Sequence, residues 1–211
     1  MSNGGAAMRT RNDRQQEACR LVLVRHATAE GDGRFQGQLD AQLSPEGRRQ
    51  LPVLSRKLRP YKIAVVYASD LRRARTTAAF AARRLGVRLE IRPELREIHF
   101  GRWQGLSWEQ VLEQFPQWAR LWAKQFPDGR VPGGEGFAQF KRRIRRELRA
   151  ITAANQARSV LVVTHGGVIR VALASALGMP DKNLFRFAVD PGGLSVIDHF
   201  RHGAVVRCVN D

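Results

Sequence analysis

The chain has 211 residues, of which 43% are hydrophobic, enough for one domain with a sizeable core. Its two cysteines, Cys19 and Cys208, fit neither a metal-site spacing nor a disulfide framework, and no apolar stretch approaches the ~18 residues of a membrane span. The formal net charge of +17 is scattered over many segments, so we expect neither a nucleic-acid nor a membrane partner.

The first hundred residues alternate between apolar runs and helical patterns. Residues 1–19 are polar without an apolar signal segment, so we expect a disordered tail, a folded domain over 20–211 and a cytoplasmic protein. Ser44 is a preferred N-cap, Ser69 can cap a second helix, and Gly86 can end it. In chain order the predicted elements are strand 21–25, helix 44–58, strand 63–67, helix 69–85 and strand 88–91.

The middle of the chain differs from this alternation. We predict a helical cap inserted at about 102–135, which covers the carboxyl edge of the sheet. A capping box at 107–110 starts a short helix, and Pro116 separates it from a second helical piece. All four tryptophans lie within 103–122, and we expect them to pack against each other more than to bind a ligand.

The last third returns to alternating elements. An apolar stripe at spacings of three and four predicts a long helix, whose basic face of Lys141, Arg142, Arg145, Arg146 and Arg149 we expect to be solvated. The alternation predicts a three-layer α/β/α sandwich with a mostly parallel sheet and an antiparallel edge strand. The predicted elements are helix 137–151, strand 160–164, helix 168–177, and strands 184–189, 194–199 and 205–209.

Two histidines follow predicted strands. His26 comes after Arg25 at the end of the first strand, and His165 ends the fourth. In open α/β sheets the chemistry gathers beyond the carboxyl ends of the strands, where Arg73 and Glu97 would also lie. Together these residues supply a nucleophile, cations for an anion and one carboxyl group, a set that fits phosphoryl transfer through a phosphohistidine. The alternative, structural histidines and solvated arginines, does not account for their convergence.

Seven blocks carry a family resemblance. They are Leu-Val-Arg-His at 23–26, Arg-Phe-Gln-Gly at 34–37, Asp40 with Leu-Ser-Pro-Glu-Gly at 43–47, Ser-Asp-Leu-Arg-Arg-Ala at 69–74, Arg-Glu-Ile-His-Phe-Gly at 96–101, Pro-Gly-Gly-Glu at 132–135 and Val-Thr-His-Gly-Gly at 163–167. In this order they resemble the histidine phosphatase superfamily, with its phosphoglycerate-mutase-like fold, from Leu21 to about Ile197.

The resemblance implies roles for these residues. His26 would attack phosphorus as neutral imidazole, while Arg25, Arg73 and His165 would hold the phosphate oxygens. Glu97 would protonate the leaving alkoxide and then activate water, as in a histidine acid-type phosphatase. No metal or cofactor is implied, because Arg25, Arg73 and His165 would balance the negative charge of the phosphate. The remaining implied substrate-binding residues are Gln36, Gly37 and Gly166.

The chain departs from the family pattern at two places. Ala27 stands where the family usually has glycine, which a negative φ would tolerate. The sequence Arg-His-Ala-Thr-Ala at 25–29 resembles protein phosphohistidine phosphatases, but these lack the inserted cap. Ile98 and Phe100 replace the arginine and tyrosine with which mutases hold phosphoglycerate. We therefore favour a phosphatase of small phosphorylated metabolites over a mutase or a protein phosphatase.

Within the family, the α-ribazole phosphatase branch is the most similar. The supporting segments are 134–140, 177–180 and 187–190, which broad-specificity phosphatases share in part. The aromatic cap would suit an aromatic or nucleoside-like leaving group such as that of α-ribazole 5′-phosphate. A non-catalytic phospho-ligand or nucleic-acid binding module on the same fold is the alternative of another class. Whether the chain forms a homodimer is left open by its sequence.

Overall fold

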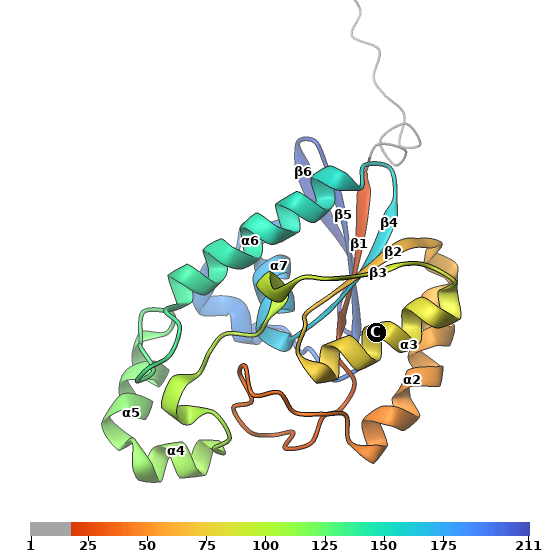
Figure 1. The fold of residues 1–211 in the computed structure, drawn as a ribbon. Helices are drawn as coiled ribbons and strands as arrows, with labels where there is room; N and C mark the ends of the chain where they lie inside the picture. The colour runs from red at the N-terminus through yellow and green to blue at the C-terminus, as the bar shows by residue number, and fades with distance from the viewer. Residues whose placement is uncertain (1–17) are drawn as a thin grey trace, which may run out of the picture.

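A computed structural model describes residues 18–211, which form one mixed sheet with helices on both faces (Figure 1). The strands of this part are β1 (Cys19–Arg25), β2 (Ile63–Ala68), β3 (Leu89–Ile91), β4 (Ser159–Thr164), β5 (Leu194–Phe200) and β6 (Gly203–Cys208). The helices are α2 (Pro45–Leu58), α3 (Arg72–Leu85), α4 (Trp108–Gln114), α5 (Pro116–Gln125), α6 (Phe137–Ala154) and α7 (Gly166–Leu177). Among these residues no helix is both long and apolar enough to cross a bilayer.

The sheet has the order β3-β2-β4-β1-β5-β6. The first four strands in this order are parallel, and β5 runs antiparallel to both of its neighbours. The predicted fold class is therefore confirmed. The antiparallel strand β5 is not the edge strand itself but lies next to β6, which forms the edge. Arg25 lies opposite Thr164 in the pair β1–β4, so these central strands end at the same level.

The two faces of the sheet bury separate cores, because side chains alternate along each strand. Leu21 and Leu23 of β1 point to the face covered by α6 and α7. Val22 and Val24 point to the opposite face, where α2 and α3 pack. These helices thus form the outer layers in Figure 1. Complete burial of such side chains contributes roughly 1.5–3 kcal/mol each, which makes the central strands a rigid base for the residues at their carboxyl ends.

The predicted tail and the two predicted serine caps of the N-terminal half have different outcomes. Residues 1–17 of the predicted tail lie outside the described residues, but Cys19 is already the first residue of β1. Ser44 caps α2 through its hydroxyl, as predicted. Ser69 does not cap α3, which begins at Arg72 after Leu71, because the Ser69 hydroxyl contacts another partner in the site.

The predicted strand 184–189 is wrong. The chain forms a 3₁₀ helix at Asp181–Arg186, and residues 187–189 belong to no strand of the described part of the chain. Leu184 is buried against the core, so the apolar run reports burial under α7 and not sheet pairing. The other predicted strands and helices are present, with ends shifted by a few residues.

The predicted cap contains α4 and α5, which lie beyond the carboxyl ends of the strands (Figure 1). The capping box at Ser107 is confirmed, with its hydroxyl accepting from the Gln110 N–H. Trp103 is completely buried at the centre of a small aromatic core of its own. On the long helix α6, Lys141 pairs with Asp181, whereas the four arginines of the predicted basic face are exposed.

A buried carboxylate ties the edge of the sheet to its centre. Asp198 on β5 is 2% exposed and accepts from Arg20 on β1 at 2.7 Å and from Arg207 on β6 at 2.8 Å. Burial alone would raise the pKa of Asp198, but the hydrogen bonds from both arginines lower it below its usual value. The carboxylate therefore stabilises the fold above its ordinary pKa, and this contribution is lost as the pH falls through the lowered one.

Replacing Asp198 by alanine should lower the free energy of unfolding by about 2 kcal/mol, because it leaves two guanidinium groups unpaired. The loss stays moderate because both arginine side chains are about one-third exposed, at 36% and 33%, and can be hydrated. Urea denaturation at neutral pH measures this, with Asp32→Ala, an exposed ion-pair carboxylate, as the control. Equal stabilities for the two variants would contradict the account.

Candidate active site

His26 and His165 lie side by side because their strands are neighbours in register. The backbone N–H of His26 donates to the Thr164 carbonyl at 2.9 Å, and the two imidazole centres are 5.2 Å apart in an edge-on arrangement. Both side chains are nearly inaccessible, with exposures of 4% and 1%. The predicted convergence of the two strand ends is thus present in the structure.

The His26 ring has a defined orientation. Its Nδ1 lies 2.8 Å from the Ala27 carbonyl oxygen, which can only accept, so Nδ1 carries the proton and Nε2 the lone pair. Arg73 donates its Nε–H to this Nε2 at 3.1 Å. Burial, and then the positive charges of Arg73 and Arg25, hold the pKa of His26 well below its ordinary value. The imidazole is therefore neutral, and its Nε2 lone pair accepts a hydrogen bond from a cation.

The Arg73 guanidinium is fixed by backbone oxygens. It is 1% exposed and donates to the carbonyls of Gly37 at 2.7 Å and Leu39 at 2.6 Å. Burial lowers the pKa of Arg73 to about 10, with the Glu97 charge acting in the opposite direction, so the group stays charged at neutral pH. Gly37 has φ +50°, a conformation that favours glycine and presents its carbonyl to Arg73.

His165 is held by a residue whose role the sequence did not indicate. Its Nε2 lies 2.9 Å from the Ser69 hydroxyl, which comes directly after β2, the other neighbour of β4. Its Nδ1 is buried without a hydrogen-bond partner among residues 18–211. Burial, and then the proximity of His26 and the charge of Arg73, hold the pKa of His165 well below its ordinary value. The site thus contains a buried ring nitrogen able to bind an oxygen atom.

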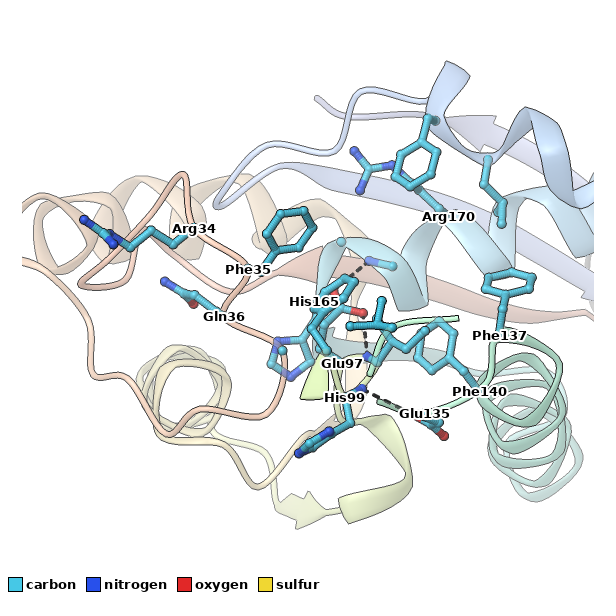
Figure 2. Close-up of a pocket in the computed structure, with 18 of the residues that line it drawn as sticks. Arg34, Phe35, Gln36, Glu97, His99, Glu135, Phe137, Phe140, His165 and Arg170 are labelled. Atoms are coloured by element: carbon cyan, nitrogen blue, oxygen red, sulfur yellow. Dashed lines mark hydrogen bonds between the residues drawn. The ribbon is translucent and has the colours of Figure 1, made fainter. Parts of the chain in front are cut away.

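The Glu97 carboxylate is positioned by backbone donors. One oxygen accepts from the Ile98 N–H and the other from the Gly167 N–H at the start of α7, both at 2.9 Å (Figure 2). The glycine is required for close approach, because a Cβ there would lie 2.3 Å from a Glu97 oxygen. Behind this loop, Arg143 donates to the carbonyls of Glu94 at 2.6 Å and Arg96 at 2.9 Å. The sequence analysis had not singled out Arg143.

A single cavity of about 270 Å³ joins these groups. Arg25 reaches it while donating to the Val189 carbonyl at 2.8 Å and contacting Asp32 at 3.3 Å. Gln36 also lines it, although its amide donates to the Glu30 carbonyl at 2.8 Å. All the sequence-predicted site residues line the cavity: Arg25, His26, Gln36, Gly37, Arg73, Glu97, His165 and Gly166.

The far wall of the cavity is aromatic. Trp122 is the one tryptophan that lines the cavity, so the expectation of packing holds for Trp103 and Trp108 and only in part for Trp122. It does not hold for Trp118, which is 43% exposed. Two further arginines line the cavity and were not predicted as site residues, Arg34 and Arg170. Arg170 lies four residues after Gly166, which puts it on the same face of α7. The aromatic residues are Phe35, Phe100, Trp122, Phe126, Phe137, Phe140 and Phe185.

Ala27 fits the unusual position beside His26. Its backbone does not adopt a positive φ, as the sequence analysis required. Its methyl group is fully buried with Leu43 and Leu51, so it fills a small apolar cluster behind the site. Among residues 18–211, no group of three or more His, Cys, Asp or Glu side chains is arranged to hold a metal ion.

Comparison with known proteins places this geometry in context. The sequence model described as "Histidine phosphatase superfamily (branch 1)" matches residues 21–211. An adenosylcobalamin/α-ribazole phosphatase of Salmonella typhimurium is 33% identical over 193 residues, covering 90% of this chain and 96% of that protein. Phosphoserine phosphatase 1 of Hydrogenobacter thermophilus is 31% identical over 180 residues, covering 84% and 85%. The crystal structure of the α-ribazole phosphatase of Shigella flexneri superposes with a TM-score of 0.82 at 29% identity, covering 91% and 96%.

The two buried neutral histidines should make the fold acid-sensitive. Their folded-state pKa values lie below 6.5, the ordinary value, so the unfolded state binds more protons as the pH falls below 6.5. Stability should decrease from there by up to about 1.4 kcal/mol per pH unit for each histidine. Urea denaturation between neutral pH and about pH 5 measures the slope. His26→Asn should reduce it and the exposed control His202→Asn should not; a slope unchanged in His26→Asn would contradict the assignment.

Proposed function

The chain belongs to the histidine phosphatase superfamily, and we propose that it is a metal-independent phosphomonoesterase of the histidine acid type, which hydrolyses small phosphorylated metabolites through a phosphohistidine on His26. The observation that carries the proposal is the state of His26. Its Nδ1 is bound to the Ala27 carbonyl, so the lone pair lies on Nε2, where it accepts a hydrogen bond from Arg73; burial and then the Arg73 charge keep the ring neutral. A neutral, oriented imidazole beside fixed cations is what nucleophilic attack on a phosphate dianion requires.

In the first step the His26 Nε2 forms a bond to phosphorus, and the bond from phosphorus to the ester oxygen breaks. The leaving oxygen takes a proton from the Glu97 carboxyl group, whose orientation two backbone N–H groups fix. The alcohol departs, and the phosphoryl group stays on His26.

In the second step water attacks the phosphorus of the phosphohistidine. Glu97, now a carboxylate, takes a proton from this water, and the His26 Nε2 recovers its lone pair as the bond to phosphorus breaks. Inorganic phosphate is released, and Glu97 has regained the proton that it gave to the alcohol.

The phosphate oxygens would be held by three groups around His26. The unpartnered Nδ1 of His165 can donate to one oxygen, since its Nε2 can accept from the Ser69 hydroxyl. Arg25 and Arg73 add positive charge, and both are anchored on backbone carbonyls, so little reorganisation is needed when charge develops on the oxygens.

The cavity wall bears on the choice of substrate. Ile98 and Phe100 line the cavity where a mutase would need polar contacts to retain phosphoglycerate. This favours hydrolysis of the phosphohistidine over transfer of the phosphoryl group back to a bound phosphoglycerate. The aromatic wall favours an alcohol with an apolar or planar part. Similarity to α-ribazole phosphatases makes α-ribazole 5′-phosphate the first substrate to test, and similarity to a phosphoserine phosphatase makes O-phosphoserine the second.

Replacing His26 by alanine should reduce kcat on every phosphomonoester by at least roughly 10³-fold, because it removes the nitrogen that forms the bond to phosphorus. Steady-state assays in EDTA would use α-ribazole 5′-phosphate, O-phosphoserine, 3-phosphoglycerate and p-nitrophenyl phosphate. His202→Ala, at an exposed hairpin position, should retain full activity. Activity that persists in His26→Ala, or a wild type inactive on the whole panel, would overturn the proposal. If α-ribazole 5′-phosphate is turned over no better than p-nitrophenyl phosphate, that substrate is excluded.

Replacing Gly167 by alanine should lower kcat about 100-fold, because the added Cβ would lie 2.3 Å from Glu97 and displace its carboxyl group. Gly136→Ala is the matched control, since a Cβ there meets nothing within 4 Å. Both variants should fold, as judged by circular dichroism. Wild-type kcat in Gly167→Ala would contradict the placement of Glu97 as the proton donor.

A further inference from the structure

Arg170 stands apart from the groups that would hold the phosphate. It lies on α7, and its guanidinium Nη1 would be 3.0 Å from a Cβ at Gly166, next to the phosphate end of the cavity. The same guanidinium lies over the Phe185 ring, 5.6 Å from its centre, at the aromatic end. In the view of Figure 2, Arg170 is on the wall opposite His99, with His165 and Glu97 between them. It thus occupies the junction of the two ends of the cavity.

The side chain is anchored, yet its outer donors are free. Its Nε donates to the Phe187 carbonyl at 3.1 Å, which fixes the plane of the guanidinium. Neither terminal nitrogen has a hydrogen bond or ion pair with any residue of the described part of the chain. Arg25 and Arg73 differ, because each uses terminal nitrogens to hold backbone carbonyls. Arg170 therefore presents unused N–H donors at a partly buried position of the cavity wall.

A guanidinium in such a place needs an oxygen acceptor. The Arg170 side chain is partly buried, and this burial lowers its pKa, with the Glu97 charge acting against it. The aromatic rings nearby offer no oxygen, and Glu97 accepts from two backbone N–H groups and makes no hydrogen bond or ion pair with Arg170. An oxygen on the alcohol part of the substrate, close to the ester bond, would meet the fork of N–H groups, and a carboxylate would bind it more strongly than a hydroxyl.

We propose that Arg170 is a substrate-specificity residue, which binds an oxygen-bearing group, a carboxylate in preference to a hydroxyl, on the alcohol part of the phosphate ester. The inference rests on the proposed phosphatase function and adds a substrate class to it: phosphate esters of acidic or polyhydroxylated alcohols. Arg170 touches the alcohol part and not the reacting atoms, so its loss acts on substrate binding and leaves the chemical step intact.

Two matched substrate pairs test the proposed role of Arg170. O-phosphoserine and O-phosphoethanolamine differ only in the carboxylate, and glycerol 1-phosphate and propyl phosphate differ in two hydroxyls. In the wild type, kcat/KM should be about 10- to 100-fold higher for O-phosphoserine than for O-phosphoethanolamine, with the difference in KM. The hydroxyl pair should show a smaller difference of the same sign. These wild-type ratios test the proposal without any variant.

Arg170→Met should abolish both differences while leaving kcat/KM for O-phosphoethanolamine and propyl phosphate within about threefold of the wild type. Arg170→Lys should restore part of the carboxylate preference, because lysine keeps the positive charge but lacks the paired N–H donors of the guanidinium. Arg142→Met, an exposed arginine of α6, is the control for the same substitution and should keep both preferences. Orthovanadate, which mimics the transferred group, should still bind to Arg170→Met.

The outcomes separate the two proposals. A wild type inactive on all esters overturns the phosphatase function itself. An active wild type without either preference overturns the role of Arg170 alone. An equal loss on all four substrates in Arg170→Met, together with weaker orthovanadate binding, also overturns it, because Arg170 would then belong to the phosphate clamp. A preference confined to the hydroxyl pair would contradict the predicted order of acceptors.

Discussion

The parallel pairing of β1 with β4 is the constraint on which the site depends. It sets Arg25 opposite Thr164, and the next residue of each strand is a histidine. The hydrogen bond from the His26 N–H to the Thr164 carbonyl continues the ladder by one step beyond the strands. A shift in register by one residue would exchange the two faces of β1 and separate the imidazoles. The two apolar cores on either side of the sheet therefore act on function, since they hold this register.

The site concentrates groups that are costly to bury together. Four arginines and three histidines line one cavity, and burial lowers the pKa of His26, His165 and Arg73. The structure offsets this cost with fixed dipoles: Arg73 is bound to two carbonyls, Arg25 to one, and Glu97 to two backbone N–H groups. Such a preorganised arrangement is suited to stabilising a phosphate in transfer, because its dipoles and charges are already in place.

Much of this arrangement could be predicted from the sequence, because strands buried on both faces leave a clear apolar signal and the residues after them are then placed by topology. His26, His165 and the helix that begins at Ser44 follow from such local patterns. Ser69 and Arg143 could not be predicted in the same way. Ser69 carries a helix-capping signal, and its contact with His165 depends on the strand order. Arg143 sits among other arginines of α6, and only the packed loop at 94–97 gives it a partner. The strand predicted at 184–189 was wrong because an apolar run reports burial without saying what it packs against.

The central claim about this site is that His26 forms a covalent phosphohistidine during turnover. Wild-type enzyme mixed rapidly with a phosphomonoester, quenched in alkaline denaturant and digested should yield a peptide that carries a phosphoryl group on His26, stable in alkali and lost in acid. The account predicts that this peptide forms faster than the enzyme turns over and is absent from His26→Ala. Turnover without a phosphorylated His26, or with the phosphoryl group on another residue, would contradict it.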